Sequence, residues 1–321
     1  MDLVASELEH LLGVYVENID EILGENVGYA VENMKKGEIV LLENLSFTSH
    51  ENENDEIFAQ SLAEIADVYV NDYFRDAHLK KASNVGITKY LPSYAGLLLE
   101  KEVKQLQELK NTLPINPFVL ILGGNNPEST IPLIEEFITT VNYVLVAGYT
   151  GLAFLKAQGY EIGKIKISDN AVNMAKEILI QANENGVTIK TPDDVLVASE
   201  IKSGADHKFV SSQNIPKDMY VVDIGPHTFN EFNKLIYDAN LVIWDGVVGV
   251  YEIPEFEYGT RSLAQAVAST EAKTVAGGIK TYEAVNKYGK LKYIDCVSTG
   301  GDSFIEFLEG VELPAIKALE N

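Results

Sequence analysis

The residues of this chain that are best placed to do chemistry are glycines that follow apolar runs. The run Phe118–Leu122 leads directly into Gly123-Gly124, and a helical pattern begins a few residues later. A strand–glycine–helix turn of this kind aims backbone N–H groups and a helix N-terminus at an anion. Phosphate loops that do chemistry usually carry a lysine, whereas here the glycines are followed by Asn125–Pro127. The turn therefore predicts a phosphate cradle that lacks its cation.

Five further strand ends lead into glycine-containing turns. Because ligands of open α/β sheets bind outside the carboxyl ends of the strands, such turns gather at one edge. A single glycine pair says little, since strand-to-helix turns use glycine for its backbone freedom. Six such turns in one chain, counting Gly123-Gly124, favour a fold derived from a nucleotide-binding protein. The five turns are Gly148, Asp223–Thr228, Trp244–Glu252, Ala276–Thr281 and Val297–Ser303.

The segment Ser298-Thr299-Gly300-Gly301 is the best anion site by itself. Its hydroxyl and N–H groups are able to ring a phosphate at the start of a helix expected over Phe304–Leu308. Asp302 in the same turn would repel that phosphate. The alternative is that Ser or Asp here only caps the helix.

The sequence shows no clear pattern for a metal site or for a catalytic nucleophile. The five histidines show no paired ligand spacing, and neither a G-x-S-x-G nor a Walker lysine motif is present. The single cysteine, Cys296, falls on an expected buried strand, where an inert thiol is the default. We therefore expect no resident metal and no catalytic nucleophile.

Charge excludes some partners. The chain of 321 residues has 48 acidic and 25 basic residues, a formal charge of −23. Such a chain repels nucleic acid and anionic membranes unless it carries a basic patch, and no sizeable patch is present. No apolar run reaches the roughly 18 residues of a membrane span. We expect neither nucleic acid nor membrane as partner, and one cysteine fits a reducing cytoplasm.

Apolar runs alternate with amphipathic helical periods along the chain. Most runs are continuous and rich in β-branched residues, which is typical of parallel sheets covered on both faces. Repeated alternation of strands and helices predicts an α/β architecture. The expected strands are Gly13–Val16, Ile39–Leu42, Val68–Asn71, Phe118–Leu122, Tyr143–Val146, Val195–Ala198, Tyr220–Asp223, Leu241–Trp244, Lys273–Val275 and Tyr293–Cys296.

A boundary between two domains is expected near the end of a charged helix. Leu97–Asn111 has helical periodicity, and Pro114 is expected to break it. We interpret this helix as a connector between an N-terminal unit and a larger C-terminal unit. The N-terminal unit has three convincing strands, which is thin for a parallel α/β domain. Part of that domain is expected to be absent.

Several segments occur in the order found in the phosphoglycerate kinase family, which the chain resembles over nearly its whole length. The resemblance implies two Rossmann-like parallel-sheet domains, the first holding 3-phosphoglycerate and the second Mg-nucleotide. It implies a truncated N-terminal domain over residues 1–112, a nucleotide-binding domain over 113–303, and a returning segment over 304–321. The matching segments include Gly37–Phe47, Leu62–His78, Lys89–Glu102, Phe154–Lys164 and Val297–Leu319.

Two departures set the chain apart from that family. The family's opening strands, which carry substrate contacts and a catalytic arginine, have no counterpart. The family's charged residues are also replaced at five positions, and at the last of these an aspartate on the nucleotide side has become lysine. These positions are Leu79, Asn116, Asn126, Thr130 and Lys280.

Other positions keep the family's residue types. Gly123, Gly124, Gly148, Gly246 and Glu252 match positions that hold the adenosine end of the nucleotide. The resemblance also assigns nucleotide contacts to a second set of turn residues. These are Gly277, Gly278, Thr281, Ser298, Thr299, Gly300 and Gly301.

We expect a degenerate phosphoglycerate kinase homologue that does not transfer phosphate and has a binding, scaffold or structural role. The first alternative is an active or altered phosphoglycerate kinase, working alone or completed by another polypeptide. The second is a nucleotide sensor that keeps residual binding of ATP, ADP or adenosine, with Mg only if nucleotide binds. Exposed strands in the N-terminal unit predict self-association or a protein partner there.

Overall fold

A computed structural model describes residues 1–112 and 115–320 and divides the chain into two compact units. One unit comprises Met1–Lys101 with Gly310–Asn321, and the other comprises Glu102–Glu309. The boundary between the units therefore lies eleven residues before the one expected after residue 112, and the returning segment starts at 310 rather than 304. The expected helix break at Pro114 lies outside the described residues.

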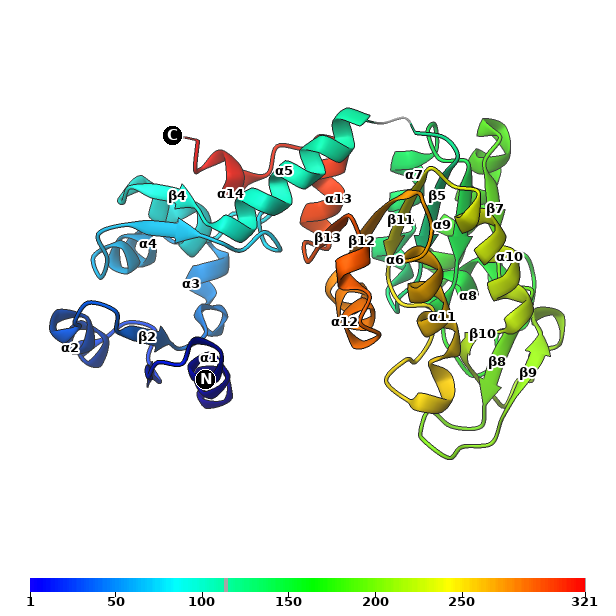
Figure 1. The fold of residues 1–321 in the computed structure, drawn as a ribbon, viewed down its shortest axis with the longest axis horizontal. Coiled ribbons are helices and arrows are strands. Elements are labelled where there is room, and N and C mark those ends of the chain that lie inside the picture. Colours follow the sequence, from blue (N-terminus) through cyan, green and yellow to red (C-terminus); the bar gives the residue numbers. More distant parts are fainter. Residues whose placement is uncertain (113–114, 321) are drawn as a thin grey trace. The chain divides into compact units, whose positions relative to one another are not determined.

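The larger unit is built on a six-stranded parallel sheet (Figure 1). Its strand order is β13-β12-β11-β5-β6-β7. Trp244 of β11 pairs with Ile121 of β5 on one side and Ala276 of β12 on the other. Burial on both faces explains why these strands are continuous apolar runs. The strands are β5 (Phe118–Leu122), β6 (Tyr143–Val146), β7 (Thr188–Lys190), β11 (Leu241–Asp245), β12 (Lys273–Gly277) and β13 (Cys296–Ser298).

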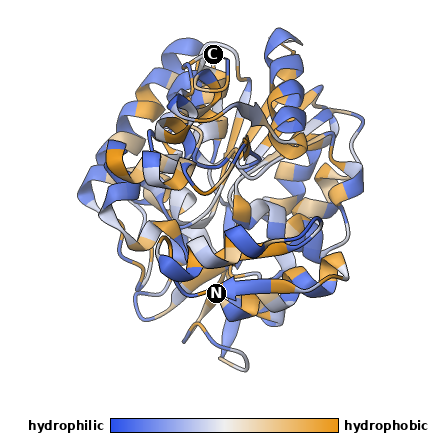
Figure 2. Ribbon diagram, turned by 90° about the vertical axis from the view of Figure 1, so that its left-hand side faces the viewer, coloured by the Kyte–Doolittle hydropathy of each residue, from blue (hydrophilic) through white to orange (hydrophobic). Residues whose placement is uncertain are grey.

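Amphipathic helices flank this sheet, and they carry both hydrophilic and hydrophobic residues along their lengths (Figure 2). In α9, local sequence determines where the helix begins and ends. Ser168 accepts a hydrogen bond from Ala171 N–H at its start, and Gly186 ends it in the left-handed conformation. The helices are α5 (Leu97–Thr112), α6 (Pro127–Thr130), α7 (Pro132–Phe137), α8 (Gly148–Ala157), α9 (Asp169–Asn185), α10 (Pro226–Tyr237), α11 (Tyr258–Val267), α12 (Ile279–Lys287) and α13 (Asp302–Glu309).

A second sheet in this unit is antiparallel, with order β10-β8-β9. Its strands are β8 (Asp194–Ala198), β9 (His207–Ser211) and β10 (Tyr220–Ile224). The parallel arrangement expected for the apolar runs of β8 and β10 was therefore wrong. Those runs are continuous because most residues of both strands are buried, and a covered antiparallel pair gives the same pattern. The mostly exposed β9 carries too few apolar residues to be predicted.

The smaller unit contains two separate parallel pairs of strands, β1-β2 and β3-β4. The strand expected over Gly13–Val16 was displaced, because α1 continues to Leu12 and Gly13 caps it at φ +68°. A similar shift moves the last expected strand to β13. The elements are α1 (Asp2–Leu12), β1 (Val16–Ile19), α2 (Glu25–Asn33), β2 (Ile39–Leu42), α3 (Ser49–Asn52), α4 (Glu56–Ala63), β3 (Tyr69–Asn71), β4 (Ser93–Ala95) and α14 (Pro314–Lys317).

The sequence-based fold class is confirmed at this level: the chain is α/β, with a parallel sheet in the larger unit and short parallel pairs in the smaller one. Within the described ranges, no helix combines the length and the hydrophobicity that crossing a bilayer requires.

Candidate nucleotide site

A pocket with a cavity of about 280 Å³ lies in the larger unit, at the carboxyl end of the parallel sheet. The turn after β5 and the first turn of α8 contribute to its wall, as do strand β10 and the turn after β11. Most of the lining is apolar. This volume lies just below the ~300–1,000 Å³ typical of ligand pockets and suits a small molecule of about nucleoside size.

Glycines bring two of these turns together. Gly123 N–H donates to the Asp245 carbonyl at 2.9 Å, and Gly124 N–H donates to the Val247 carbonyl at 2.8 Å. Gly246 has φ +85°, and a Cβ there would lie 2.6 Å from the Gly123 carbonyl carbon. Only glycine fits this close backbone approach. The predicted Gly123, Gly124 and Gly246 thus hold the turns in place, and of these three Gly124 lines the cavity.

The α8 helix opens directly onto the pocket. Gly148, its first residue, has φ +56°, and no side chain caps the helix start. Tyr149 N–H donates to the Gly124 carbonyl at 2.9 Å, which fixes the helix against the glycine turn. Gly148 was predicted from the sequence, whereas Tyr149 and Leu152 of the same helix were not, although both line the cavity. Their helical spacing along one face was the signal that could have found them.

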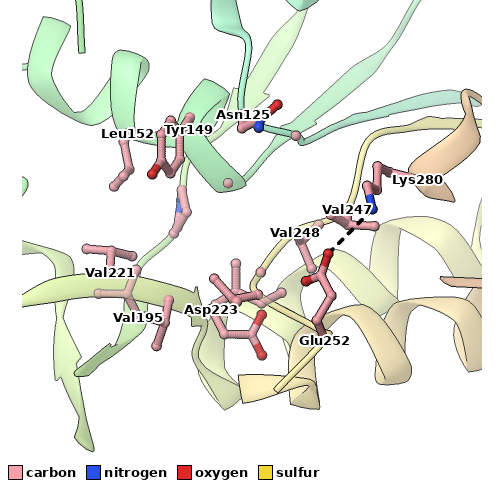
Figure 3. A pocket seen from close by; sticks show the side chains of 17 residues that line it. Asn125, Tyr149, Leu152, Val195, Val221, Asp223, Val247, Val248, Glu252 and Lys280 are labelled. Carbon is pink, nitrogen blue, oxygen red and sulfur yellow. Dashed lines mark ion pairs between the residues drawn. The ribbon is translucent and has the colours of Figure 1, made fainter. Parts of the chain in front are cut away.

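The pocket has an apolar end and a polar end (Figure 3). Tyr149, Leu152 and Val221 lie toward one end, while Glu252 and Lys280 lie toward the other. Val195 and Val221 come from the antiparallel sheet, which is why reasoning from parallel strands alone missed them. This polarity suits a ligand with a flat apolar part and a hydrophilic part.

Lys280 at the polar end is held by two carboxylates. Its Nζ lies 2.9 Å from Glu283 Oε2 and 3.7 Å from Glu252 Oε1. The hydrogen bond that Lys280 donates to Glu283 is the main cause that raises the pKa of Lys280. Glu252 was a predicted nucleotide contact, whereas Lys280 was noted only as a replaced family position, and both line the pocket.

Two aspartates lie near the turns, Asp223 buried and Asp245 partly buried. Burial raises the pKa of Asp223 to about 8, although Gly259 N–H donates to its carboxylate. Burial, followed by the charge of Asp302, raises the pKa of Asp245 to about 7. Asp223 lines the pocket and Asp245 ends strand β11. At neutral pH both groups carry a proton for much of the time.

Four of the replaced positions lie away from the cavity lining. Asn126 precedes α6, and the Thr130 hydroxyl donates to the Asn126 carbonyl at 2.8 Å. The Asn116 carbonyl accepts from Asn240 Nδ2. Leu79 belongs to the smaller unit, so nothing relates it to this pocket. Only Lys280 of the five replaced positions lines the cavity.

The predicted Ser298–Gly301 anion turn is engaged within the protein. The Ser298 hydroxyl donates to Glu102 Oε2 at 3.0 Å, and the Thr299 hydroxyl donates to Glu102 Oε1 at 3.3 Å. Gly300 N–H donates to Ser298 Oγ, and Gly301 precedes α13 with φ +49°. The Glu102 carboxylate therefore accepts hydrogen bonds from the two hydroxyls that were predicted to bind a phosphate.

The remaining predicted residues join that turn to the sheet. Gly278 N–H donates to the Ser298 carbonyl at 3.0 Å, and Gly277 ends strand β12. The Thr281 hydroxyl accepts from Gly246 N–H at 2.8 Å. Gly277, Gly278 and Thr281 thus pack beside the pocket without lining it. Across the part of the chain that the structure describes, no three His, Cys, Asp or Glu side chains come together as a metal site.

Comparison with known proteins identifies the family. The family model described as phosphoglycerate kinase matches residues 1–311. The chain is 40% identical to a phosphoglycerate kinase of Moorella thermoacetica, over 99% of this chain and 81% of that protein. A phosphoglycerate kinase of Borreliella burgdorferi is 41% identical with the same coverage. This chain belongs to the phosphoglycerate kinase family.

Solved structures agree with this membership. The crystal structure of a Pyrococcus horikoshii phosphoglycerate kinase matches with a TM-score of 0.88 at 27% identity, covering 99% of this chain and 82% of that one. A Coxiella burnetii phosphoglycerate kinase matches with a TM-score of 0.76 at 35% identity, covering 99% and 80%. The family resemblance seen in the sequence is confirmed, and the chain spans about four fifths of these relatives.

Proposed function

We propose that this member of the phosphoglycerate kinase family binds an adenine nucleotide in the pocket of its larger unit and does not transfer phosphate. The main support for this proposal is the distribution of apolar and polar residues in the pocket. Its apolar end suits a purine ring, and Glu252 at the polar end suits the hydroxyl groups of a ribose. Membership of a kinase family supports the choice of an adenine nucleotide over other flat ligands.

The side chains at the family's phosphate-handling positions do not favour phosphoryl transfer. Phosphoryl transfer relies on positioning and on cations that neutralise the moving phosphate. At the positions where the family resemblance expects lysines, Asn126 and Thr130 offer an amide and a hydroxyl. Each missing charged donor costs several kcal/mol of transition-state stabilisation. Losing several donors reduces turnover to near background.

Phosphoglycerate kinase activity is the second candidate function. The relatives at about 40% identity are all named phosphoglycerate kinase, which favours it. The two candidates share the nucleotide site and differ in the chemistry that follows binding. A nucleotide sensor is the form that binding without transfer would take.

Two measurements test the proposal. Calorimetry of the purified chain with adenosine, AMP and ATP tests binding, and a coupled assay with ATP and 3-phosphoglycerate tests transfer. Val221→Trp fills the apolar end of the pocket and is expected to abolish binding, while Ile180→Trp on the exposed face of α9 is the matched control.

Binding that Val221→Trp removes, without turnover above the level of a mock preparation, supports the proposal. Turnover that Val221→Trp abolishes and Ile180→Trp retains would establish the kinase instead. If no nucleoside or nucleotide binds, the proposed site is wrong.

A further inference from the structure

The polar end of the pocket contains an unexpected positive charge. Among the described residues that line the cavity, Lys280 is the only one with a cationic side chain. It comes from α12, on the far side of the pocket from α8 (Figure 3). A pocket that lacks lysine in its glycine turn therefore has one on a different element.

The position of Lys280 is not explained by the helix that carries it. Lys280 is the second residue of α12, and the N-terminus of a helix disfavours a cation. Glu283 and Glu252 offset this cost, but both pairs are exposed, and exposed ion pairs contribute little stability. The lysine thus gains little from its own helix and faces a pocket that suits a ligand with a hydrophilic end.

The lining at this end does not fit the magnesium ion that the family implies. Magnesium in nucleotide sites is held by carboxylates together with phosphate oxygens. Here the lining residue Glu252 and its neighbour Glu283 are both paired with the Lys280 ammonium group. The other carboxylate of the lining, Asp223, is buried and accepts a hydrogen bond from Gly259 N–H. A divalent cation placed among them would face that ammonium at close range, and like charges repel.

We propose that Lys280 replaces a metal ion as the positive charge that faces the ligand, so that the pocket takes a metal-free adenine nucleotide with a single phosphate. This inference rests on the proposed nucleotide-binding function and specifies its ligand. One lysine offsets a large part of the charge of a single phosphate group, which is about −1.5 to −2 at neutral pH. Every further phosphate adds negative charge to a chain that already carries −23, without a second cation in the lining.

The Lys280 side chain is free to change partners when a ligand arrives. More than half of its surface is exposed, and the same holds for Glu252. The ammonium is able to leave Glu252 for a phosphate oxygen while Glu283, one helical turn further along α12, stays within reach. Glu252 is then left to accept hydrogen bonds from ribose hydroxyls.

Calorimetry with AMP and adenosine, each measured in EDTA and again with millimolar magnesium chloride, tests the inference. AMP is expected to bind with the same affinity, within about twofold, in both conditions. A charge-assisted hydrogen bond from Lys280 to phosphate makes AMP bind about tenfold more tightly than adenosine. Rising salt is expected to weaken AMP binding and to leave adenosine binding unchanged.

Three variants assign the effect to the lysine. Lys280→Ala is expected to bring AMP down to the affinity of adenosine, and Lys280→Arg is expected to keep the difference. Lys176→Ala, an exposed lysine of α9 outside the pocket lining, is the matched control and should change neither. Thermal unfolding of each variant shows whether it is folded.

Different outcomes overturn different claims. AMP binding that strengthens tenfold with magnesium would overturn metal-free recognition while leaving nucleotide binding intact. An AMP affinity that Lys280→Ala does not change would overturn the role of the lysine. If neither adenosine nor AMP binds, the proposed function falls together with this inference.

Discussion

The hydroxyl of Ser298 donates a hydrogen bond of 3.0 Å to the carboxylate of Glu102, 196 residues earlier in the chain. Both side chains are almost completely buried. Thr299 adds a second hydroxyl on the other carboxylate oxygen at 3.3 Å. The turn with the strongest phosphate-binding pattern in the sequence therefore fastens α5 to the parallel sheet of the larger unit.

Glu102→Ala is expected to destabilise the protein. The substitution leaves two hydroxyl groups without their acceptor, and an unsatisfied buried polar group costs about 1–3 kcal/mol. The free energy of unfolding, measured in urea, should fall by about 2 kcal/mol or more. Glu100→Ala on the exposed part of the same helix should change it by less than about 0.5 kcal/mol. Equal effects of the two variants would argue against a structural role for this contact.

A second prediction concerns Asp245. Folding raises its pKa from 3.8 to about 7, mainly because the fold removes much of the water around the carboxyl. Between these values the folded protein holds a proton that the unfolded chain releases, so the free energy of unfolding falls as pH rises through this range. Asp223, with a pKa raised to about 8, acts in the same direction. The melting temperature is expected to be higher at pH 6 than at pH 8.5.

Asp245→Asn tests the origin of this slope, because an amide does not titrate. Between pH 6 and pH 8.5, the melting temperature of the variant is expected to fall by less than that of the parent protein. Asp218→Asn, at an exposed position of the same unit, controls for the general effect of removing one negative charge. If both variants flatten the slope equally, the net charge of the chain rather than the Asp245 carboxyl causes it.

The sequence predicted what backbone geometry requires and missed what side-chain packing decides. Gly124, Gly148 and Gly246 were predictable because close backbone approach and positive φ admit only glycine. Val221 and Tyr149 were not, since an apolar residue beside a ligand gives the same pattern as one in the core. The β8–β10 sheet shows a similar limit, because burial on both faces does not reveal strand direction.

The Ser298–Gly301 turn shows a third limit of prediction from sequence. Its residues were recognised as an anion-binding pattern, and an anion does face two of its hydroxyls, but that anion is Glu102. A single sequence gives no means of telling a phosphate from an internal carboxylate nearly two hundred residues away. Lys280 was noted from the sequence as a replaced position. That it lines the pocket is seen only in the structure, from the position of α12.

The last prediction concerns association through the smaller unit. Its strands form two parallel pairs, and within the described ranges neither pair joins a larger sheet. Parallel sheets are normally covered on both faces, and two-stranded sheets are marginal by themselves. Large apolar side chains on this unit are exposed, among them Leu11 at 70% and Val70 at 56%. Covering one such side chain gains about 1.5–3 kcal/mol. We therefore expect the chain to associate through this unit.

Light scattering over a dilution series should show the average mass rising with protein concentration. Salt should promote the association, because it screens the repulsion between copies that each carry −23. Leu11→Glu adds a charge on the exposed face of α1 and is expected to shift the species toward monomer. Ile180→Glu, at a similarly exposed position on α9 of the larger unit, should leave the mass unchanged. A well-folded monomer at every concentration and salt level would mean that these apolar residues tolerate water, and that the smaller unit is stable without a second copy.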